Sequence, residues 1–450
     1  MITIYKDNIE LDKILNREIQ SYGDYEKIVK DIISKVINEG DKAVLEYSRK
    51  FDCPDLENLQ VSEEELEEGY ENTSSELISI LKEAKENIEF FHKHQLKSGF
   101  RIEKDNGVIL GQKYTPIEKV GIYVPGGTAA YPSTVLMNAI PAKIAGVSEI
   151  VMVTPCGKDG KIKNEILAAA KLCGVNKIFK CGGAQAIAAL AYGTETIPSV
   201  YKIVGPGNIF VALAKKEVFG KVSIDMIAGP SEILIIADKT ANPNYVAADL
   251  LSQAEHDKLA TAVLVTDSIE LASKTSEAIE QRIEKLPRKD IARASIDTNG
   301  KIIIVENIDK AIEISNKIAP EHLEICVSDP FNYIDKIENA GSIFMGHNTP
   351  EAIGDYFAGP NHTLPTGGSA KFSSPLSVDD FVKKSAYSFY SHSATLEAMN
   401  KISKFAECEG LNAHAESVLI RGENVWAVSF QTSLKILFHI PLGNSWKEII

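Results

Sequence analysis

The sequence predicts an α/β fold made of two α/β units, with helical segments near both ends. From about residue 110 onward, short apolar and β-branched runs recur, each bounded by Gly or Pro, and helix-like segments separate many of them. The runs do not alternate with polar residues, which is typical of strands buried on both faces of a parallel sheet. They are numerous for a single sheet, so we expect two parallel-rich sheets.

The first hundred residues predict mostly helices. Ile28, Ile32 and Val36 recur at helical spacing, and Gly40 marks the end of that helix. Residues 62–94 predict further helix, with acidic residues in the first turn. The predicted strands are residues 120–124, 149–155, 177–183, 201–207, 232–238, 261–267, 301–307, 322–327 and 342–346.

The segment that follows the predicted strands returns to a helical pattern. Residues 377–391 begin with a Ser–x–x–Asp cap pattern, which predicts a helix there. Residues 394–421 predict one or two more helices.

Composition narrows the possible partners and location. The chain has 48 Lys and Arg against 62 Asp and Glu, a net charge of −14, so we expect no nucleic-acid partner. The six cysteines are scattered singly, which argues against a cysteine-based zinc site or a disulfide framework. No signal peptide is visible, and the apolar stretch 425–443 is broken by polar residues and Pro441. We therefore expect a soluble protein of the cytoplasm, without membrane partners.

Three predicted strands end in glycine-rich turns, at residues 123–135, 181–191 and 204–217. A strand followed by a glycine turn and a helix leaves backbone N–H groups free to bind an anion. One such turn alone often has only a steric reason. Three in adjacent units favour a dinucleotide or phosphate ligand, to which Tyr123, Gln185 and Asn208 could bind.

Four stretches in the second half hold residue types common in catalysis, and they contain four of the nine histidines: residues 252–257, 319–325, 354–368 and 407–417. Each histidine alone is more often a helix cap or a surface residue. Gln253 and His256 are three residues apart and therefore neighbours on one helix face.

Zinc needs three or four nitrogen, oxygen or sulfur ligands. With no paired thiols, the natural set is His256, Asp355 and His414, with Gln253 as an unusual fourth ligand. Glu321 and His322 would then be acid/base groups.

Three functional classes remain open from the residues alone. One is a zinc-containing dehydrogenase that binds a nicotinamide cofactor at the glycine turns. Another is a zinc hydrolase in which Glu321 activates water. The third is a non-enzymatic α/β binding protein, which would leave the polar clusters without a role. The glycine turns favour the dehydrogenase.

From the N-terminal helices to about Arg421, the chain resembles the histidinol dehydrogenase family. The resemblance is carried by an ordered set of motifs: YVPGGTAAYPSTVLMNAIPAKIAGV, CGGAQAIAALAYGT, VGPGN, AGPSEILIIAD, DLLSQAEHD, APEHLEI, GDYFAGPNHTLPTGGSAKFSSPLSVDDF and EGLNAHAESV. It implies the oxidation of L-histidinol to L-histidine by two NAD+, through a bound aldehyde, as the last step of histidine biosynthesis. The alternative functions are a zinc-dependent hydrolase and a dehydrogenase of a related amino alcohol.

The resemblance also implies roles for individual residues. One zinc ion per subunit would be bound by Gln253, His256, Asp355 and His414, which would also contact the substrate. Glu321 and His322 would be the proton acceptors, and His322 would also touch the substrate. Further substrate contacts would come from Ser231, Glu409 and His362, and nucleotide contacts from Tyr123, Gln185 and Asn208.

For the fold, the resemblance implies two incomplete Rossmann-like domains with small helical extensions, in a homodimer that exchanges segments and shares its active sites. The expected parts are an N-terminal arm (1–20), a discontinuous first α/β domain (21–125 and 231–374), a second Rossmann-like domain (126–230) and a C-terminal helical extension (375–421). Residues 422–450 form a tail that departs from the family pattern.

Overall fold

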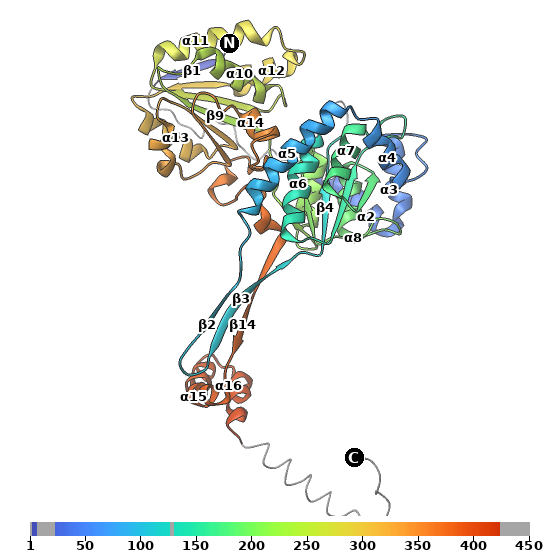
Figure 1. Ribbon diagram of the computed structural model, residues 1–450, viewed down its shortest axis with the longest axis vertical. Helices are drawn as coiled ribbons and strands as arrows, with labels where there is room; N and C mark the ends of the chain where they lie inside the picture. Colours follow the sequence, from blue (N-terminus) through green and yellow to red (C-terminus); the bar gives the residue numbers. More distant parts are fainter. Residues whose placement is uncertain (1, 7–22, 127–129, 424–450) are drawn as a thin grey trace, which may run out of the picture. The chain divides into compact units, whose positions relative to one another are not determined.

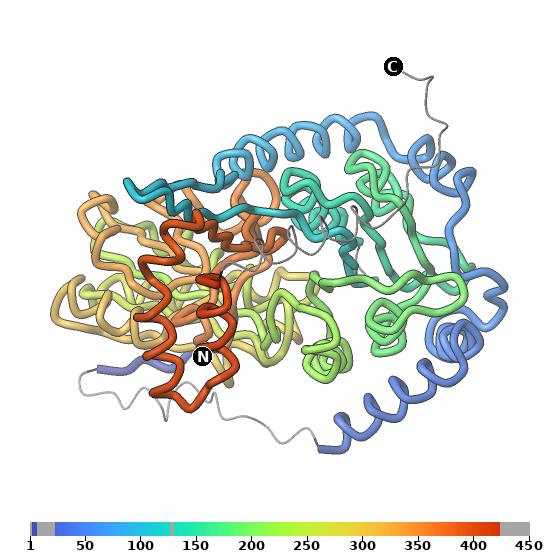
Figure 2. The backbone as a smooth tube through the Cα atoms, turned by 90° about the horizontal axis from the view of Figure 1, so that it is seen from below, coloured from blue at the N-terminus to red at the C-terminus, as the bar shows by residue number. Residues whose placement is uncertain are grey.

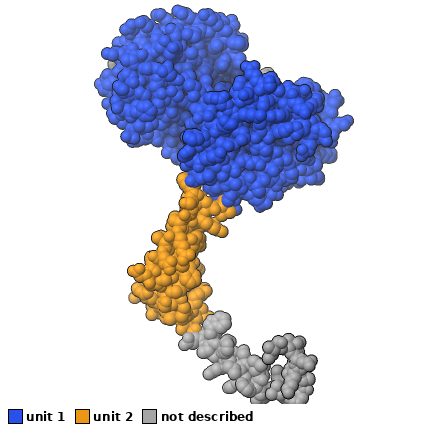
Figure 3. Space-filling view, viewed as in Figure 1, with its two compact units in different colours: residues 1–96, 116–383 blue, residues 97–115, 384–450 orange. Residues whose placement is uncertain are grey.

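The computed structural model describes residues 2–6, 23–126 and 130–423 of the chain. They form two compact units, drawn in blue and orange in Figure 3. The first unit takes its described residues from 1–96 and 116–383, and the second takes its own from 97–115 and 384–450. All of the atypical tail after Glu423, and most of the expected N-terminal arm, lie outside the described residues.

A six-stranded parallel sheet forms one half of the first unit. Its order is β1 (Thr3–Lys6), β11 (Lys301–Ile304), β10 (Thr261–Thr266), β9 (Glu232–Ala237), β12 (His322–Cys326) and β13 (Ser342–Met345). The flanking helices are α10 (Pro243–Ala254), α11 (Ile269–Ile283), α12 (Lys289–Asn299) and α13 (Ile308–Ile318). Helices α10, α11 and α12 cover one face of the sheet and α13 covers the other (Figure 1). Ile235 of β9 belongs to the apolar cluster of the first three helices, and Leu234 belongs to that of α13. Burial on both faces explains the unbroken apolar runs of these strands.

A five-stranded parallel sheet forms the other half of this unit. Its order is β6 (Lys177–Lys180), β5 (Glu149–Thr154), β4 (Lys119–Tyr123), β7 (Lys202–Val204) and β8 (Ser223–Ile224). Its covering helices are α6 (Pro132–Ala145), α7 (Asn164–Cys173), α8 (Gly183–Tyr192) and α9 (Ile209–Val218). Residues 59–61 run antiparallel along the edge strand β6, where the N–H of Val61 donates to the carbonyl of Ile178 at 2.9 Å.

The N-terminal helices belong to the core of this second sheet. They are α2 (Gly23–Glu39), α3 (Asp41–Phe51), α4 (Glu63–Glu71) and α5 (Ser75–Lys93). Val36 and Val44 are buried in the same cluster as the strands of the five-stranded sheet, and α2 packs against α8 and α9. The expected division had assigned residues 21–125 to the first α/β domain. The apolar faces of these helices are instead buried against the five-stranded sheet, which also contains β4.

The second unit is small. It contains the sheet β14 (Val382–Phe389), β3 (Ile109–Pro116) and β2 (Phe100–Glu103), in that order, with β2 and β3 antiparallel. Helices α15 (His392–Cys408) and α16 (Asn412–Leu419) pack against each other (Figure 2, where they are drawn in red). The helix predicted over 377–391 is therefore wrong. The Ser377–Asp380 capping box does form, but it begins only a short 3₁₀ turn, Val378–Phe381. The following residues pair with β3, and such tertiary pairing overrides local helical preference.

The remaining predictions of local structure are largely confirmed. All nine predicted strands are present, as are helices over the first hundred residues and two helices over 394–421. Besides β14, strands β1, β2, β3 and β8 were not predicted. Within the described ranges, no helix combines the length and apolar character needed to cross a membrane.

Candidate active site

Polar side chains gather at the amino-terminal edge of the six-stranded sheet. Strands β9 and β12 are parallel neighbours, with His322 in register with Ile233. Glu232 and His322 therefore begin adjacent strands side by side. Helix α10 runs back across the sheet, and the N–H of Thr261, the first residue of β10, donates to the carbonyl of Ser231 at 3.0 Å. The end of α10, which carries Gln253, thus returns to the same edge.

His322 lies at the centre of this cluster and is 4% exposed. Its Nδ1 lies 3.1 Å from the carbonyl oxygen of Glu232, so Nδ1 must carry the donating proton. The neutral ring then has its lone pair on Nε2, which is buried and has no hydrogen-bond partner among the described residues. Burial alone lowers the pKa of His322, but three nearby carboxylates, chiefly that of Glu351, raise it well above its ordinary value. Nε2 is therefore placed to take a proton or to bind a cation.

Glu321 is a second buried acid/base group beside this ring. Its Oε2 accepts a hydrogen bond from the N–H of Glu232 at 2.9 Å and lies 3.7 Å from Nδ1 of His322. Burial raises the pKa of Glu321 to about 8, against the opposing effect of His322. A carboxyl group with a pKa near neutrality can both take up and release protons during a reaction.

Two further carboxylates come from the short helix α14 (Glu351–Tyr356). Glu351 and Asp355 are one turn apart and share a face of the helix. Asp355 Oδ1 lies 3.6 Å from Nε2 of His322, and Glu351 Oε1 lies 3.9 Å from it. Burial raises the pKa of Glu351 to about 7. Burial also acts against ionisation of Asp355, but the nearby imidazole of His322 lowers its pKa overall.

These groups have the composition of a cation site. Among the described residues, one ligand atom each from His322, Glu351 and Asp355 lies within 4.8 Å of the other two. Imidazole and carboxylate are ligand types that zinc accepts, and Nε2 of His322 is a buried nitrogen of the group with no hydrogen-bond partner among the described residues. The group shares only Asp355 with the zinc ligands expected from the sequence.

The other expected ligands lie around this group or in the second unit. Gln253 is 1% exposed, and its amide, oriented by its neighbours, donates to Oε1 of Glu351 at 3.0 Å. Desolvation lowers the pKa of His256, and the carboxylate of Asp355 opposes this. His414 is exposed on α16 and Glu409 caps the end of α15, so both belong to the second unit.

The remaining expected substrate contacts are in the first unit. Ser231 directly precedes β9 at the amino-terminal edge. Nδ1 of His362 lies 3.0 Å from the carbonyl oxygen of Asp355 and donates to it. Sequence reasoning missed Glu351, which is 3% exposed. Its spacing of four residues from Asp355 was the available signal.

The expected nucleotide contacts gather elsewhere, at the carboxyl ends of β4, β6 and β7. The strand order reverses direction between β4 and β7, and ligands of open parallel sheets bind at such a point. Tyr123 ends β4, and its hydroxyl accepts from the N–H of Gly183 at 3.1 Å. Burial raises the pKa of Tyr123 to about 12. Gln185 is 2% exposed, and the side chain of Asn208 caps α9 by accepting from Phe210 and Val211. Residues 127–129 of the first glycine turn lie outside the described residues.

A buried ion pair fixes the third glycine turn. Lys215 pairs with Asp225, and their side chains are 3% and 1% exposed. Lys215 Nζ donates to the carbonyl of Gly205 at 3.0 Å, and the N–H of Gly205 donates to Asp225 at 2.8 Å. Gly205 has φ +111°, a conformation that only glycine adopts without strain. The turn is therefore held rigidly over the end of β4.

The loop after α14 links the two halves of the first unit. Asn361 donates from its amide to the carbonyl of Met137 in α6 at 2.6 Å. It also lies 3.5 Å from Nε2 of the buried His92 on α5. Because α6 follows the first glycine turn, this loop joins the polar cluster to the half that carries the candidate nucleotide edge.

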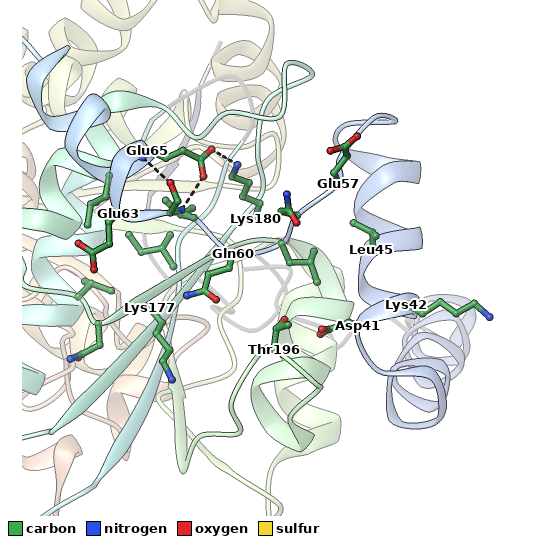
Figure 4. A pocket seen from close by; sticks show the side chains of 18 residues that line it. Asp41, Lys42, Leu45, Glu57, Gln60, Glu63, Glu65, Lys177, Lys180 and Thr196 are labelled. Carbon is green, nitrogen blue, oxygen red and sulfur yellow. Dashed lines mark hydrogen bonds and ion pairs between the residues drawn. The ribbon is translucent and has the colours of Figure 1, made fainter.

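A cavity of about 830 Å³ opens beside β6, at some remove along the chain from these residues. Figure 4 shows Glu65, Lys177, Lys180 and Thr196 in its wall, with Lys180 paired to Glu65. No residue of the polar cluster or of the expected nucleotide contacts lines it, so the cavity does not change the location of the candidate site.

Comparison with known proteins places these observations in one family. The sequence model of the family described as histidinol dehydrogenase matches residues 15–422. A histidinol dehydrogenase of Clostridium acetobutylicum is 57% identical over 395 residues, which cover 88% of this chain and 92% of that protein. One of Bacillus subtilis is 54% identical over 399 residues, covering 89% and 93%. The crystal structure of histidinol dehydrogenase from Elizabethkingia anophelis superposes with a TM-score of 0.89 at 41% identity, covering 93% and 98%.

The geometry of the third glycine turn makes one prediction. A Cβ at position 205 would lie 2.1 Å from the carbonyl oxygen of Tyr123, whereas a Cβ at position 220 meets no atom within 4 Å. Both glycines have positive φ, so Gly220→Ala should cost only backbone strain of roughly 1–3 kcal/mol. Gly205→Ala adds a backbone clash, and its midpoint of urea unfolding should be clearly lower. Equal midpoints for the two variants would contradict this account of the turn.

Proposed function

The chain belongs to the histidinol dehydrogenase family, and we propose that it oxidises L-histidinol to L-histidine in two steps with two NAD+ and one zinc ion per subunit. The match to the family model over residues 15–422, and to a relative over 88% of the chain, supports the activity. The observation that carries the chemical details is the buried cluster at the amino-terminal edge of the six-stranded sheet. There a base with a free lone pair, His322, lies between a carboxyl of raised pKa and two carboxylates of α14.

For the metal, we propose Gln253, His256 and Asp355 as ligands, together with His414. Gln253 and Asp355 both lie beside the His322 ring, and His256 is within electrostatic range of Asp355. Their nitrogen and oxygen atoms suit zinc, and no thiol is needed. His322 and Glu351 lie against this set and remain free for proton transfer and for orienting Gln253. When bound, the zinc ion would fix the imidazole and amine of histidinol, and NAD+ would accept the hydride in each oxidation.

His322 is proposed as the base of the first oxidation. Its Nδ1 proton is committed to the carbonyl of Glu232, so Nε2 is the nitrogen that takes the proton of the substrate hydroxyl. Loss of that proton and of a hydride from the adjacent carbon converts the alcohol to an aldehyde. Ser231, His362 and Glu409 are proposed to hold the substrate during this step.

Glu321 is proposed as the base of the second oxidation. An aldehyde must add water before a second hydride can leave, and Glu321 takes a proton from that water. Its raised pKa, about 8, supports this role because the carboxylate is then a stronger base than an exposed one. Loss of a second hydride from the hydrate, with its remaining acidic proton, gives the carboxylate, so the two steps together consume one water and release three protons. Keeping the aldehyde enclosed avoids the release of a reactive compound.

The nucleotide is proposed to bind at the carboxyl ends of β4, β6 and β7. Tyr123 and Gln185 line this edge from β4 and α8, and Asn208 begins α9. The reversal of strand order there supports this assignment. We propose a cytoplasmic location, where a biosynthetic dehydrogenase has access to NAD+.

A homodimer with shared active sites completes the proposal. His414 and Glu409 belong to the second unit and are exposed on it. Exposed apolar side chains, among them Phe389 (55% exposed) and Phe405 (69% exposed), lie on the same unit. Exposed apolar surface of this kind supports docking on another protein surface. We propose that each active site takes His414 of the partner subunit.

The reaction is tested by its stoichiometry. Purified protein with zinc, L-histidinol and NAD+ should form two NADH for each histidine, because an alcohol becomes a carboxylate in two hydride transfers. NADH is followed by absorbance and histidine by chromatography. One NADH per turnover, with aldehyde accumulating, would show that the protein catalyses only the first oxidation. Product formed without NADH would favour the hydrolase.

The division of roles between the two bases makes a second prediction. Glu321→Gln should slow histidine formation by about 10²–10⁴-fold, the usual worth of a positioned base. It should slow the first hydride transfer, measured as NADH formed in a single turnover, less than His322→Ala does. Glu306→Gln, at an exposed carboxylate, is the control and should behave as wild type. Wild-type turnover of Glu321→Gln on both histidinol and the aldehyde would refute the assignment.

The shared site makes a third prediction, tested by mixing two inactive proteins. In a mixed dimer of His256→Ala and His414→Ala subunits, one site carries both substitutions and the other carries neither. Random exchange makes about half of the dimers mixed, so roughly a quarter of wild-type activity should return. If His414 serves its own subunit, every site keeps one substitution, and no activity returns even when subunit exchange is demonstrated.

A further inference from the structure

A pair of carboxyl groups, one buried and one partly buried, lies next to the catalytic cluster and takes no part in the chemistry proposed above. Glu324 is 1% exposed on β12, two residues after His322 and therefore on the same face of the strand. Asp249 lies on α10, one turn before Gln253 and therefore on the same face of that helix. The two carboxyl groups are hydrogen bonded to each other.

One oxygen of Glu324 holds the start of α14. Its Oε1 accepts a hydrogen bond from the N–H of Glu351, the first residue of that helix, at 2.8 Å. The residue before Glu351 is Pro350, and no side chain of α14 itself caps the helix. Glu324 thus acts as a cap supplied by a neighbouring strand, which satisfies a helix N–H that would otherwise be buried without a partner.

A hydrogen bond between two carboxyl groups requires a proton on one of them. Burial raises the pKa of Asp249 to about 6 and the pKa of Glu324 well above its ordinary value. Glu324 therefore carries the proton and donates it to Asp249. One neutral and one charged carboxyl cost less to bury than two charges would.

The consequence is that one side chain joins the three elements that carry the candidate site. Through Asp249 it reaches α10, which carries Gln253. Through its own backbone it is part of β12, which begins with His322. Through Glu351 it fixes α14, whose next turn carries Asp355.

We propose that Glu324, bridged to Asp249, is a positioning residue that holds α14 and α10 in register with β12, and so sets the geometry of Asp355 and Gln253 about His322. This inference rests on the proposed metal site and reaction. Residues that orient ligands in this way typically change metal affinity or activity by about 10–100-fold when removed.

The sharpest comparison is between two substitutions at position 324. Gln is the isostere of a protonated Glu: its oxygen can accept from Glu351 and its amide can donate to Asp249. Met has a similar length but supports neither hydrogen bond. Glu324→Gln should keep kcat and zinc retention near wild type. Glu324→Met should lower kcat by about 10–100-fold and release zinc correspondingly faster to a coloured chelator, with KM for NAD+ unchanged.

Glu65→Met is the matched control. Glu65 also accepts from a backbone N–H at a helix start, that of Ser62 at 3.0 Å, but it serves α4 in the other half of the unit. Its loss should lower the melting temperature slightly and leave kcat and zinc release unchanged. If Glu324→Met gives no folded protein, Asp249→Leu removes the same bridge from the α10 side and should show the same faster zinc release.

Two results would overturn the inference. One is a folded Glu324→Met protein, or its Asp249→Leu substitute, with wild-type kcat and zinc release. The other is a Glu324→Gln protein as impaired as Glu324→Met, since the retained hydrogen bonds would then not be what matters. Both leave the proposed function intact if wild-type protein holds zinc and oxidises histidinol. A wild-type protein that does neither would overturn the function and this inference together.

Discussion

The burial of several carboxyl groups around one imidazole is the constraint on which the first unit depends. Glu321, Glu351 and Asp355 lie against His322 in a setting where unpaired charge is costly. Backbone N–H groups and the imidazole stabilise part of this negative charge, and the remainder attracts a cation. A divalent ion and the ammonium group of an amino alcohol both meet that need. The buried charge of the cluster therefore costs folding stability but suits the binding of a cation, a combination that is common at functional sites.

The two sheets supply two different edges, and their separation fits a reaction with two kinds of ligand. At the five-stranded sheet, glycine turns follow the carboxyl ends of the strands, and the pair Lys215–Asp225 keeps one turn rigid. At the six-stranded sheet, the polar cluster lies at the amino-terminal edge, because α10 returns there and α14 begins beside Glu324 of β12. The loop at Asn361 connects the halves through a hydrogen bond to α6. Hydride transfer needs both ligands on one rigid frame, since small displacements of reacting groups cost much of the rate.

The sequence predicted those features that depend on local pattern. Unbroken apolar runs identified nine strands, because both faces of a parallel strand are buried. The spacing of Gln253 and His256 predicted one shared helix face, but α10 ends at Ala254 and His256 lies in the turn that follows. A helix was predicted where residues 382–389 form a strand. The capping box before it does form, but it starts only a short 3₁₀ turn, and the pairing with β3 is a tertiary contact that the local sequence does not show. Glu324 and Glu351 were overlooked for a related reason. An acidic residue in an apolar strand or a short helix gives no sign of its partner until the fold brings them together.

The second unit shows why some predicted ligands stand apart from the rest. Helix α15 buries only Ala394 and Ser403, although Ile402 and Phe405 are among its apolar residues and are 44% and 69% exposed. Helices gain most of their stability from packing an apolar face, so these helices need another surface. A second copy of the chain would supply this surface, and in a two-fold symmetric dimer each subunit would supply it to the other. If His414 and Glu409 bind there as proposed, dimerisation does more than stabilise the helices. It becomes the event that completes each metal site, and activity should then follow the population of dimers rather than the concentration of folded chains.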